Sequence, residues 1–318
     1  MARRRGGALA YAGRMEWTSD VAAGDWIRDR LESAWTLHHF VPTDFPAYAR
    51  VFHPAYRERP VGAAWPAEGD LDGWEQLQGR EVDVERIAWS DAAAAFGTEM
   101  HGAAAWHLVA QTDPPNESPI DADGWRYLAP QQGLIEPDVL AGIGAHLAAH
   151  TSTPDDGYAA IWEGWGGLLG FLGTRGSNVG LSAAYAEDAH HASMLRESYR
   201  DAFNNVFRKK TWHPGILDDE ISRGPRLELP DRGHVLFRAA PSTWADPSWP
   251  STVPWHEGDY TRSPSLIWPA DRAWVLVTEI DADSTIIAGA PDLIRALCTD
   301  PGLEAHAIHP RDDIPLTA

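Results

Sequence analysis

The closing part of the chain, residues 272–309, reads RAWVLVTEIDADSTIIAGAPDLIRALCTDPGLEAHAIH. Its apolar runs and turn residues predict two strands, a helix and a third strand, over residues 272–280, 284–288, 291–298 and 303–309. Pro291 suits the first position of the helix, since its fixed φ matches that position. Asp300-Pro301-Gly302 supplies the turn that ends the helix. The segment therefore predicts a C-terminal β-β-α-β unit.

Upstream of this unit, short periodic segments alternate with stretches rich in proline and glycine. The periodic segments predict helices and strands: helices near residues 25–40, 91–96, 103–110, 137–150 and 181–207, and strands near residues 45–56, 158–163 and 233–239. Pro46 and Pro54 bracket the first of these strands, so we expect it near a sheet edge. Residues 57–80 and 112–133 are expected to be irregular loops, and residues 211–269 are expected to be a loop-rich segment that contains only the strand at 233–239.

This mixture of elements predicts an α+β fold, with a mixed sheet and several helices. We expect residues 15–318 to form a single compact domain, because no long low-complexity linker interrupts them. Residues 1–14 carry four arginines and no acid, and they lack the apolar segment of a signal peptide. We therefore expect a disordered leader, or a misassigned start with Met15 as the natural first residue.

Composition excludes several classes of function. The 318 residues include 26 basic and 46 acidic side chains, which gives a net charge of −20. This charge repels phosphate backbones and anionic lipids, so neither nucleic acid nor membrane is an expected partner. The single cysteine, Cys298, excludes an internal disulfide and a cysteine-based zinc cluster. A cytoplasmic protein is expected, and its oligomeric state is left open.

An aromatic and charged segment lies within the tryptophan-rich stretch 211–269. It reads WHEGDYTR over residues 255–262, with Trp268 six positions further on. Aromatic faces beside carboxylates suit a sugar, a cationic group or a partner peptide. Trp255, Tyr260 and Trp268 are therefore the candidate ligand-binding residues. The alternative is that these tryptophans pack into the core.

Two hypotheses for the function follow. The first is a non-catalytic protein that binds a small ligand or a partner protein through this aromatic surface. The second is a hydrolase whose site is assembled from distant segments, with His256 as the general base. In that case Glu257 or Asp259 would orient His256, and Arg262 would hold an anion.

Acidic and histidine residues offer only weak metal sites. Glu279, Asp281 and Asp283 alternate at the end of a predicted strand, which would aim them to one face for Ca²⁺ or Mg²⁺. A solvated turn is the alternative reading of these three acids. The other groups are Glu187 with His190, which has no second copy, and the loose set Glu99, His101 and His107. No cofactor is predicted, because the zinc-protease motif is absent and the dinucleotide motif is incomplete. The nucleophile elbow of one class of hydrolases is absent as well.

Three runs of the sequence resemble blocks of an uncharacterised protein family from high-GC actinobacteria. They are VPTDFPAYARVFHPAYR at residues 41–57, IWEGWG at 161–166 and SPSLIWPADRAWVLVTEIDADSTIIAGAPDLIRAL at 263–297. The resemblance covers residues 15–303, and the part before Met15 departs from it. It implies a cytoplasmic actinobacterial protein, and it brings no activity and no catalytic residue with it.

Overall fold

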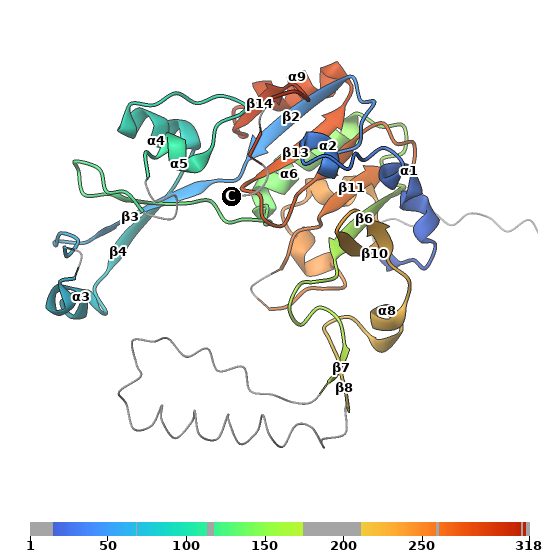
Figure 1. Ribbon diagram of the computed structural model, residues 1–318, viewed down its shortest axis with the longest axis horizontal. Helices are drawn as coiled ribbons and strands as arrows, with labels where there is room; N and C mark the ends of the chain where they lie inside the picture. The colour runs from blue at the N-terminus through green and yellow to red at the C-terminus, as the bar shows by residue number, and fades with distance from the viewer. Residues whose placement is uncertain are drawn as a thin grey trace, which may run out of the picture. The chain divides into compact units, whose positions relative to one another are not determined.

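A computed structural model of the chain describes residues 15–67, 69–112, 118–173, 211–258, 261–312 and 314–315 (Figure 1). Its helices lie against antiparallel sheets, which confirms the predicted α+β class. The predicted leader, residues 1–14, lies outside the described residues, as does the predicted helix 181–207 with Glu187 and His190.

The largest sheet has nine strands among the described residues, all paired antiparallel. In spatial order they are β1 (Glu16–Trp17), β10 (Arg232–Arg238), β6 (Gly157–Trp162), β11 (Leu266–Pro269), β12 (Val275–Val277), β13 (Ser284–Gly289), β2 (Ala47–Phe52) and β14 (Ala305–Ile308), while β9 (Leu227–Leu229) pairs with β10. The helices of the described residues are α1 (Asp25–Arg28), α2 (Leu37–Phe40), α3 (Leu71–Leu77), α4 (Trp89–Phe96), α5 (Trp106–Val109), α6 (Pro137–Ala149), α8 (Asp219–Arg223) and α9 (Pro291–Thr299). Three 3₁₀ turns accompany them: η1 (Val21–Gly24), η4 (Pro241–Ala245) and η5 (Trp249–Thr252).

The predicted C-terminal unit is confirmed as β12, β13, α9 and β14. Both β13 and β14 pair antiparallel with β2, so they run parallel to each other with β2 between them. Strand β2 is therefore interior, and its predicted place near an edge is wrong. Pro46 and Pro54 stand just outside Ala47–Phe52, so neither removes a donor from the ladder.

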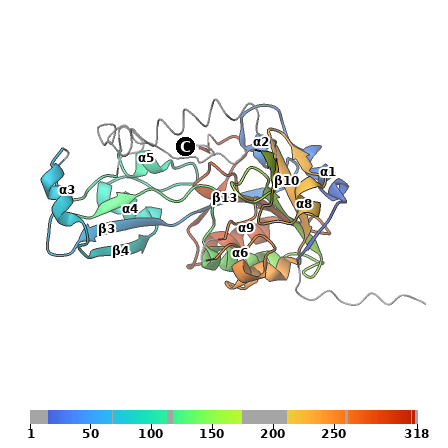
Figure 2. The ribbon, with the colours of Figure 1, turned by 90° about the horizontal axis from the view of Figure 1, so that it is seen from below.

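The two faces of this sheet are covered by different parts of the chain. On one face, Trp26, Ile27, Leu37 and Val41 pack with strand residues into one core cluster. Figure 2 shows α6 and α9 on the opposite side from α2. Helix α6 packs so closely on η4 that a Cβ atom at Gly144 would lie only 2.4 Å from the Trp244 backbone. The absence of a side chain at this position allows that approach.

Residues 211–269 include the predicted strand at 233–239, confirmed as β10, and are more regular than the loop-rich segment expected. They contain β8 (Thr211–His213), α8, β9, β10 and β11. Trp244, Trp249, Trp255 and Trp268 within this stretch are among the largest fully buried side chains. Large aromatic rings fill the core here, so the segment folds around its tryptophans instead of displaying them.

A second, three-stranded sheet continues from the end of β2. It consists of β4 (Val82–Ile87), β3 (Ala55–Pro60) and β5 (Arg126–Leu128), with β3 in the middle. The loop predicted over residues 57–80 is therefore partly wrong. Arg57–Pro60 extends the strand, and Asp70 caps the helix α3 by accepting a hydrogen bond from the Gly73 N–H at 3.0 Å.

The chain divides into two compact units, which differs from the single domain predicted. The first unit comprises Met1–Glu163 with Pro225–Ala318, and the second is Gly164–Gly224. In the second unit, β7 (Phe171–Gly173) pairs with β8. No helix within the described residues has the length and apolar character that crossing a membrane requires.

Candidate functional site

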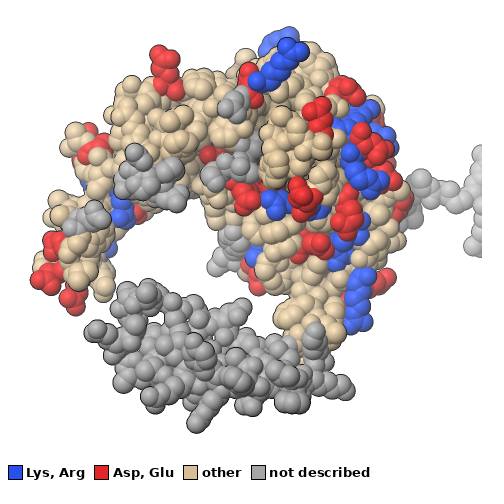
Figure 3. All heavy atoms as spheres, viewed as in Figure 1, with Lys and Arg blue, Asp and Glu red and all other residues tan. Residues whose placement is uncertain are grey.

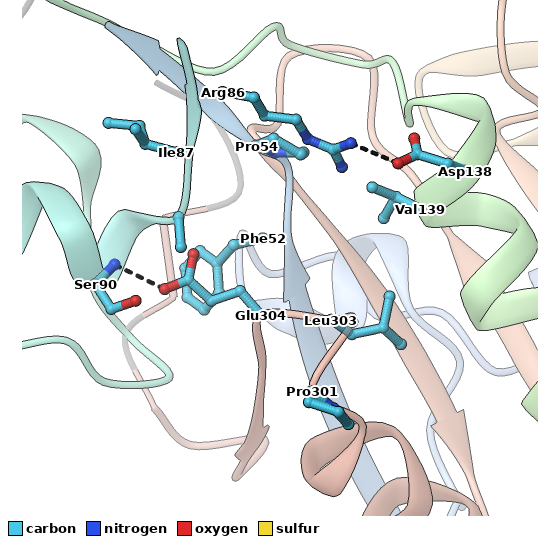
Figure 4. A pocket seen from close by; sticks show the side chains of 12 residues that line it. Phe52, Pro54, Arg86, Ile87, Ser90, Asp138, Val139, Pro301, Leu303 and Glu304 are labelled. Carbon is cyan, nitrogen blue, oxygen red and sulfur yellow. Dashed lines mark hydrogen bonds and ion pairs between the residues drawn. The ribbon is translucent and has the colours of Figure 1, made fainter.

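A pocket of about 470 Å³ lies in the first unit, where the three-stranded sheet meets the large one (Figure 4). We call it the junction pocket. Four separate stretches of chain line it: Phe52 at the end of β2 with Pro54, residues 86–88 with Ser90 at the β4–α4 junction, Asp138 and Val139 in α6, and Pro301–Glu304 before β14. Apolar side chains of Phe52, Val139 and Leu303 form its floor, while charged side chains stand at its ends.

Glu304 occupies one end of the junction pocket and caps helix α4. Its Oε2 accepts a hydrogen bond from the Trp89 N–H at 2.5 Å, and its Oε1 accepts one from the Ser90 N–H at 2.7 Å. The N-cap residue is Ala88, whose methyl group cannot accept these bonds. A carboxylate from a distant segment therefore satisfies the first amides of the helix and complements its dipole.

Arg86 and Asp138 stand at the other end. The Arg86 Nη1 lies 2.5 Å from the Asp138 Oδ2, and its Nε lies 3.3 Å from the Glu136 Oε2. Burial alone would raise the pKa of Asp138, but the hydrogen bond and charge of Arg86 lower it. The Tyr56 hydroxyl donates to Glu136 at 2.6 Å, and burial together with this carboxylate raises the pKa of Tyr56 to about 12.

These contacts define what the junction pocket can do chemically. None of the described residues that line it is a histidine, cysteine or lysine. Its charged lining comprises one guanidinium, from Arg86, and two carboxylates, from Asp138 and Glu304. An apolar floor with a few fixed polar groups is typical of a ligand-binding pocket.

The predicted aromatic surface is not formed by Trp255 and Trp268. Each side chain is only 1% exposed, so their expected exposure is wrong. Trp255 packs on Phe237 and donates its Nε1–H to the Arg262 carbonyl at 2.8 Å. Trp268 stacks on Tyr158 with 5.4 Å between ring centroids. Both rings belong to the core, which was the alternative interpretation, and Tyr260 lies outside the described residues.

The predicted hydrolase residues are only partly brought together. The Glu257 carboxylate lies 3.8 Å from the Arg262 guanidinium, so Arg262 already faces an anion of its own chain. The exposed His256 ring makes a hydrogen bond through Nδ1 with the Thr261 hydroxyl at 2.7 Å. Asp259, the other candidate orienting acid, lies outside the described residues.

The three acids predicted as a metal site do not converge. Strand β12 ends at Val277, so the alternation of a strand does not extend to these acids. Glu279 and Asp281 both pair with Arg232, whereas Asp283 pairs with Arg50 at 3.0 Å. Among the described residues, no three His, Cys, Asp or Glu side chains form a group that could hold a metal ion, Glu99, His101 and His107 included.

Sequence reasoning missed a fully buried arginine on β2. Arg50 donates to the Ser284 hydroxyl at 2.7 Å, the Ala104 carbonyl at 2.7 Å and the Asp283 carboxylate at 3.0 Å. Its guanidinium also lies 4.4 Å from the centre of the Phe52 ring. The side chain thereby joins two strands of the large sheet to the segment before α5.

A second missed group is a buried histidine beside a hydroxyl. His53 contacts the Gln131 carbonyl through Nδ1 at 3.1 Å and the Thr285 hydroxyl through Nε2 at 2.9 Å. The carbonyl requires a proton on Nδ1, so the neutral ring accepts the Thr285 hydrogen at Nε2. Hydroxyl and imidazole lie as they do in some hydrolases, but both side chains are buried, which makes this a structural contact.

Comparisons with protein-family models, with curated proteins and with solved structures found no match to this chain.

Proposed function

We propose that this protein is a non-catalytic binding protein whose ligand occupies the junction pocket. The observation that carries the proposal is the combination of an apolar floor with charged groups held at both ends by Arg86, Asp138 and Glu304. Held in place by their partners, these groups need little ordering when a ligand arrives, which favours binding. The lining offers no nucleophile paired with a histidine base, so binding explains it better than hydrolysis does.

The charges of the junction pocket favour a particular class of ligand. Two lining carboxylates outnumber one guanidinium, and Glu136 adds a third carboxylate beside Arg86. A carboxylate offers about four lone-pair sites, so Asp138 and Glu304 retain acceptor capacity beyond the bonds already made. A small molecule with an apolar body and one ammonium group satisfies both the floor and the carboxylates.

The test compares phenethylamine with phenylacetate, which have similar shapes and opposite charges. We expect phenethylamine to shift the backbone amide resonances of Trp89 and Ser90 in a saturable NMR titration, and phenylacetate to shift them much less. Glu304→Gln should weaken the binding of phenethylamine, because the variant keeps an oxygen that can cap α4 but loses the negative charge. The exposed Glu99→Gln serves as the matched control. Equal responses to both probes, or shifts unaffected by Glu304→Gln, would contradict the proposal.

Two further proposals concern the setting of the protein. We propose that it acts in the cytoplasm and that it belongs to the actinobacterial family that its sequence resembles. The single cysteine supports the first, because proteins of oxidising compartments commonly carry disulfides. The runs at residues 41–57, 161–166 and 263–297 support the second.

A further inference from the structure

Strand β4 is the outermost strand of the three-stranded sheet in the part of the chain that the structure describes. Six residues of β3 pair with it in unbroken register, from Ala55↔Ile87 to Pro60↔Val82. Figures 1 and 2 show β3 and β4 running side by side toward α3. Alternate backbone N–H and C=O groups of such a terminal strand point away from its neighbour, which makes it a template for another strand.

One face of this edge is acidic. Across the sheet, Arg57 stands opposite Glu85 and Arg59 stands opposite Asp83. The Arg57 Nε lies 2.8 Å from the Glu85 carboxylate, and Arg59 lies 3.9 Å from Asp83. Each of these two cross-strand pairs therefore places a basic side chain on β3 and an acidic side chain on β4, at the open edge. A basic residue on an added strand would continue this alternation of charge.

The other face of the edge is apolar. Val82 and Val84 are 37% and 59% exposed, although β-branched side chains gain from being covered. Glu58 of β3 stands opposite Val84, and its carboxylate accepts a hydrogen bond from Arg126 of β5. The Arg126 guanidinium lies 3.7 Å from the centre of the Trp65 ring. Trp74 of α3, itself partly exposed, lies 6.0 Å from Trp65. A strand added to β4 would cover these two aliphatic side chains, whereas the two aromatic rings lie over Arg126 of β5, on the far side of β3.

The charge around the edge decides what kind of strand fits. Residues 70–87 contain six acids, Asp70, Asp72, Glu75, Glu81, Asp83 and Glu85, against two arginines. Figure 3 shows acidic side chains at the outer end of this sheet, over α3. A second copy of β4 is disfavoured, because antiparallel pairing of apolar face with apolar face sets Asp83 and Glu85 against acids of the copy. Like charges directly opposite each other are destabilising.

We infer that β4 is a docking edge for an extended segment of a partner protein in which basic residues alternate with apolar ones. The basic residues face Asp83 and Glu85, and the apolar residues cover Val82 and Val84. Backbone hydrogen bonds supply affinity in this mode of recognition, and the alternating side chains supply specificity. This inference uses residues 82–85 of β4, whereas Arg86 at the end of the strand lines the junction pocket, and it stands whether or not that pocket binds an amine.

The experiment uses the full chain and a capped eight-residue peptide in which lysine alternates with valine. We expect the peptide to bind in calorimetry and to slow hydrogen exchange of β4 amides. The same peptide with glutamate in place of lysine should not bind. Alternate N-methylation of the lysine peptide should abolish binding, because it removes the donors of the ladder.

Two variants with the same change of charge make the test specific. Asp83→Lys should lower the affinity for the lysine peptide by at least about tenfold, since it sets like charges opposite each other. Asp72→Lys, on α3, should lower this affinity by no more than about twofold, because surface charges away from the contact act weakly. Equal weakening by both variants would show unspecific charge attraction and overturn the inference. Protection of every β4 amide in the free protein would also overturn it, because the edge would then be covered already.

Discussion

Two buried histidines carry the clearest pH dependence at the scale of single residues. Burial lowers the pKa of His53 and of His234 from 6.5 to about 4. His53 belongs to the chain of contacts through Gln131 and Thr285, and His234 lies on β10 against β6 and β9. Both rings are therefore neutral in the folded protein at pH values where an exposed histidine takes up a proton.

We expect the free energy of unfolding to fall as the pH drops from about 6.5 to about 4. In this window the unfolded chain binds protons at His53 and His234 and the folded chain does not, so protons favour unfolding. The stabilisation present above pH 6.5 amounts to about 3 kcal/mol per histidine, at 1.36 kcal/mol for each pKa unit. Urea unfolding between pH 7.5 and 4.5 measures this slope.

Substitutions separate the histidines from the carboxylates that titrate in the same range. His53→Gln and His234→Gln should each flatten the slope relative to the unchanged protein, whatever they do to stability at pH 7.5. His101→Gln is the control, because that side chain is exposed. Parallel pH profiles for the unchanged protein and both buried variants would contradict the expectation.

At the scale of elements, α4 depends on a cap from far along the chain. Glu304 accepts from the Trp89 and Ser90 amides, and the N-cap residue Ala88 offers no side-chain oxygen. Glu304→Ala should therefore destabilise the protein by about 1–2 kcal/mol, the usual loss for a removed cap. Urea unfolding measures this loss, and hydrogen exchange at Trp89 and Ser90 shows whether it is local to α4. Glu304→Gln should lose less than Glu304→Ala, and an unchanged exchange rate in the alanine variant would contradict the role of the cap.

Elements with strong local signals could be predicted from the sequence. The helix α6 begins at Pro137 as expected, and the order β12, β13, α9, β14 follows from apolar runs and turn residues. What local signals could not supply is the neighbour of each strand. The prolines beside β2 suggested an edge, yet the strand they flank lies in the middle of the sheet, between β13 and β14.

The same limit explains why the junction pocket escaped prediction. Its lining combines residues near positions 52, 86, 138 and 304, none of which belongs to a recognisable motif. The predicted site relied instead on tryptophans and charged residues close together in sequence, such as Trp255 and Glu257. The Trp255 ring is buried against Phe237 inside the first unit, so it cannot form the predicted binding surface. Composition does not distinguish a tryptophan that fills a core from one that binds a ligand.

At the scale of the whole molecule, the second unit is an insertion between neighbouring points of the first. The Glu163 carboxylate lies 3.0 Å from Arg226, and the Glu163 N–H donates to the Gly233 carbonyl at 3.0 Å. The chain thus leaves the large sheet after β6 and returns to it at β9 close to where it left. Insertions at such places are tolerated when the flanking backbone keeps its contacts.

We expect the first unit to fold without the second. Replacing residues 164–224 by a short glycine and serine linker should change its free energy of unfolding by less than about 2 kcal/mol, since a shorter loop closes at lower entropic cost. Far-UV circular dichroism and a single cooperative urea transition would show a retained fold. A variant that also carries Glu163→Ala tests whether the ion pair with Arg226 holds the two ends. Loss of cooperative unfolding in the linker variant would show that the two units fold only together.

The position of β2 has a consequence for how this protein is made on the ribosome. Its two neighbours, β13 and β14, come from far along the chain: Arg50 of β2 and Ser284 of β13, which its side chain contacts, are 234 positions apart. At synthesis rates of about 5–20 residues per second, that distance corresponds to roughly 10–50 s. During this time a mostly apolar strand has neither of its final partners. We therefore expect β2 to stay unpaired in the nascent chain until β13 and β14 emerge, and an unpaired apolar strand of this kind is prone to aggregation.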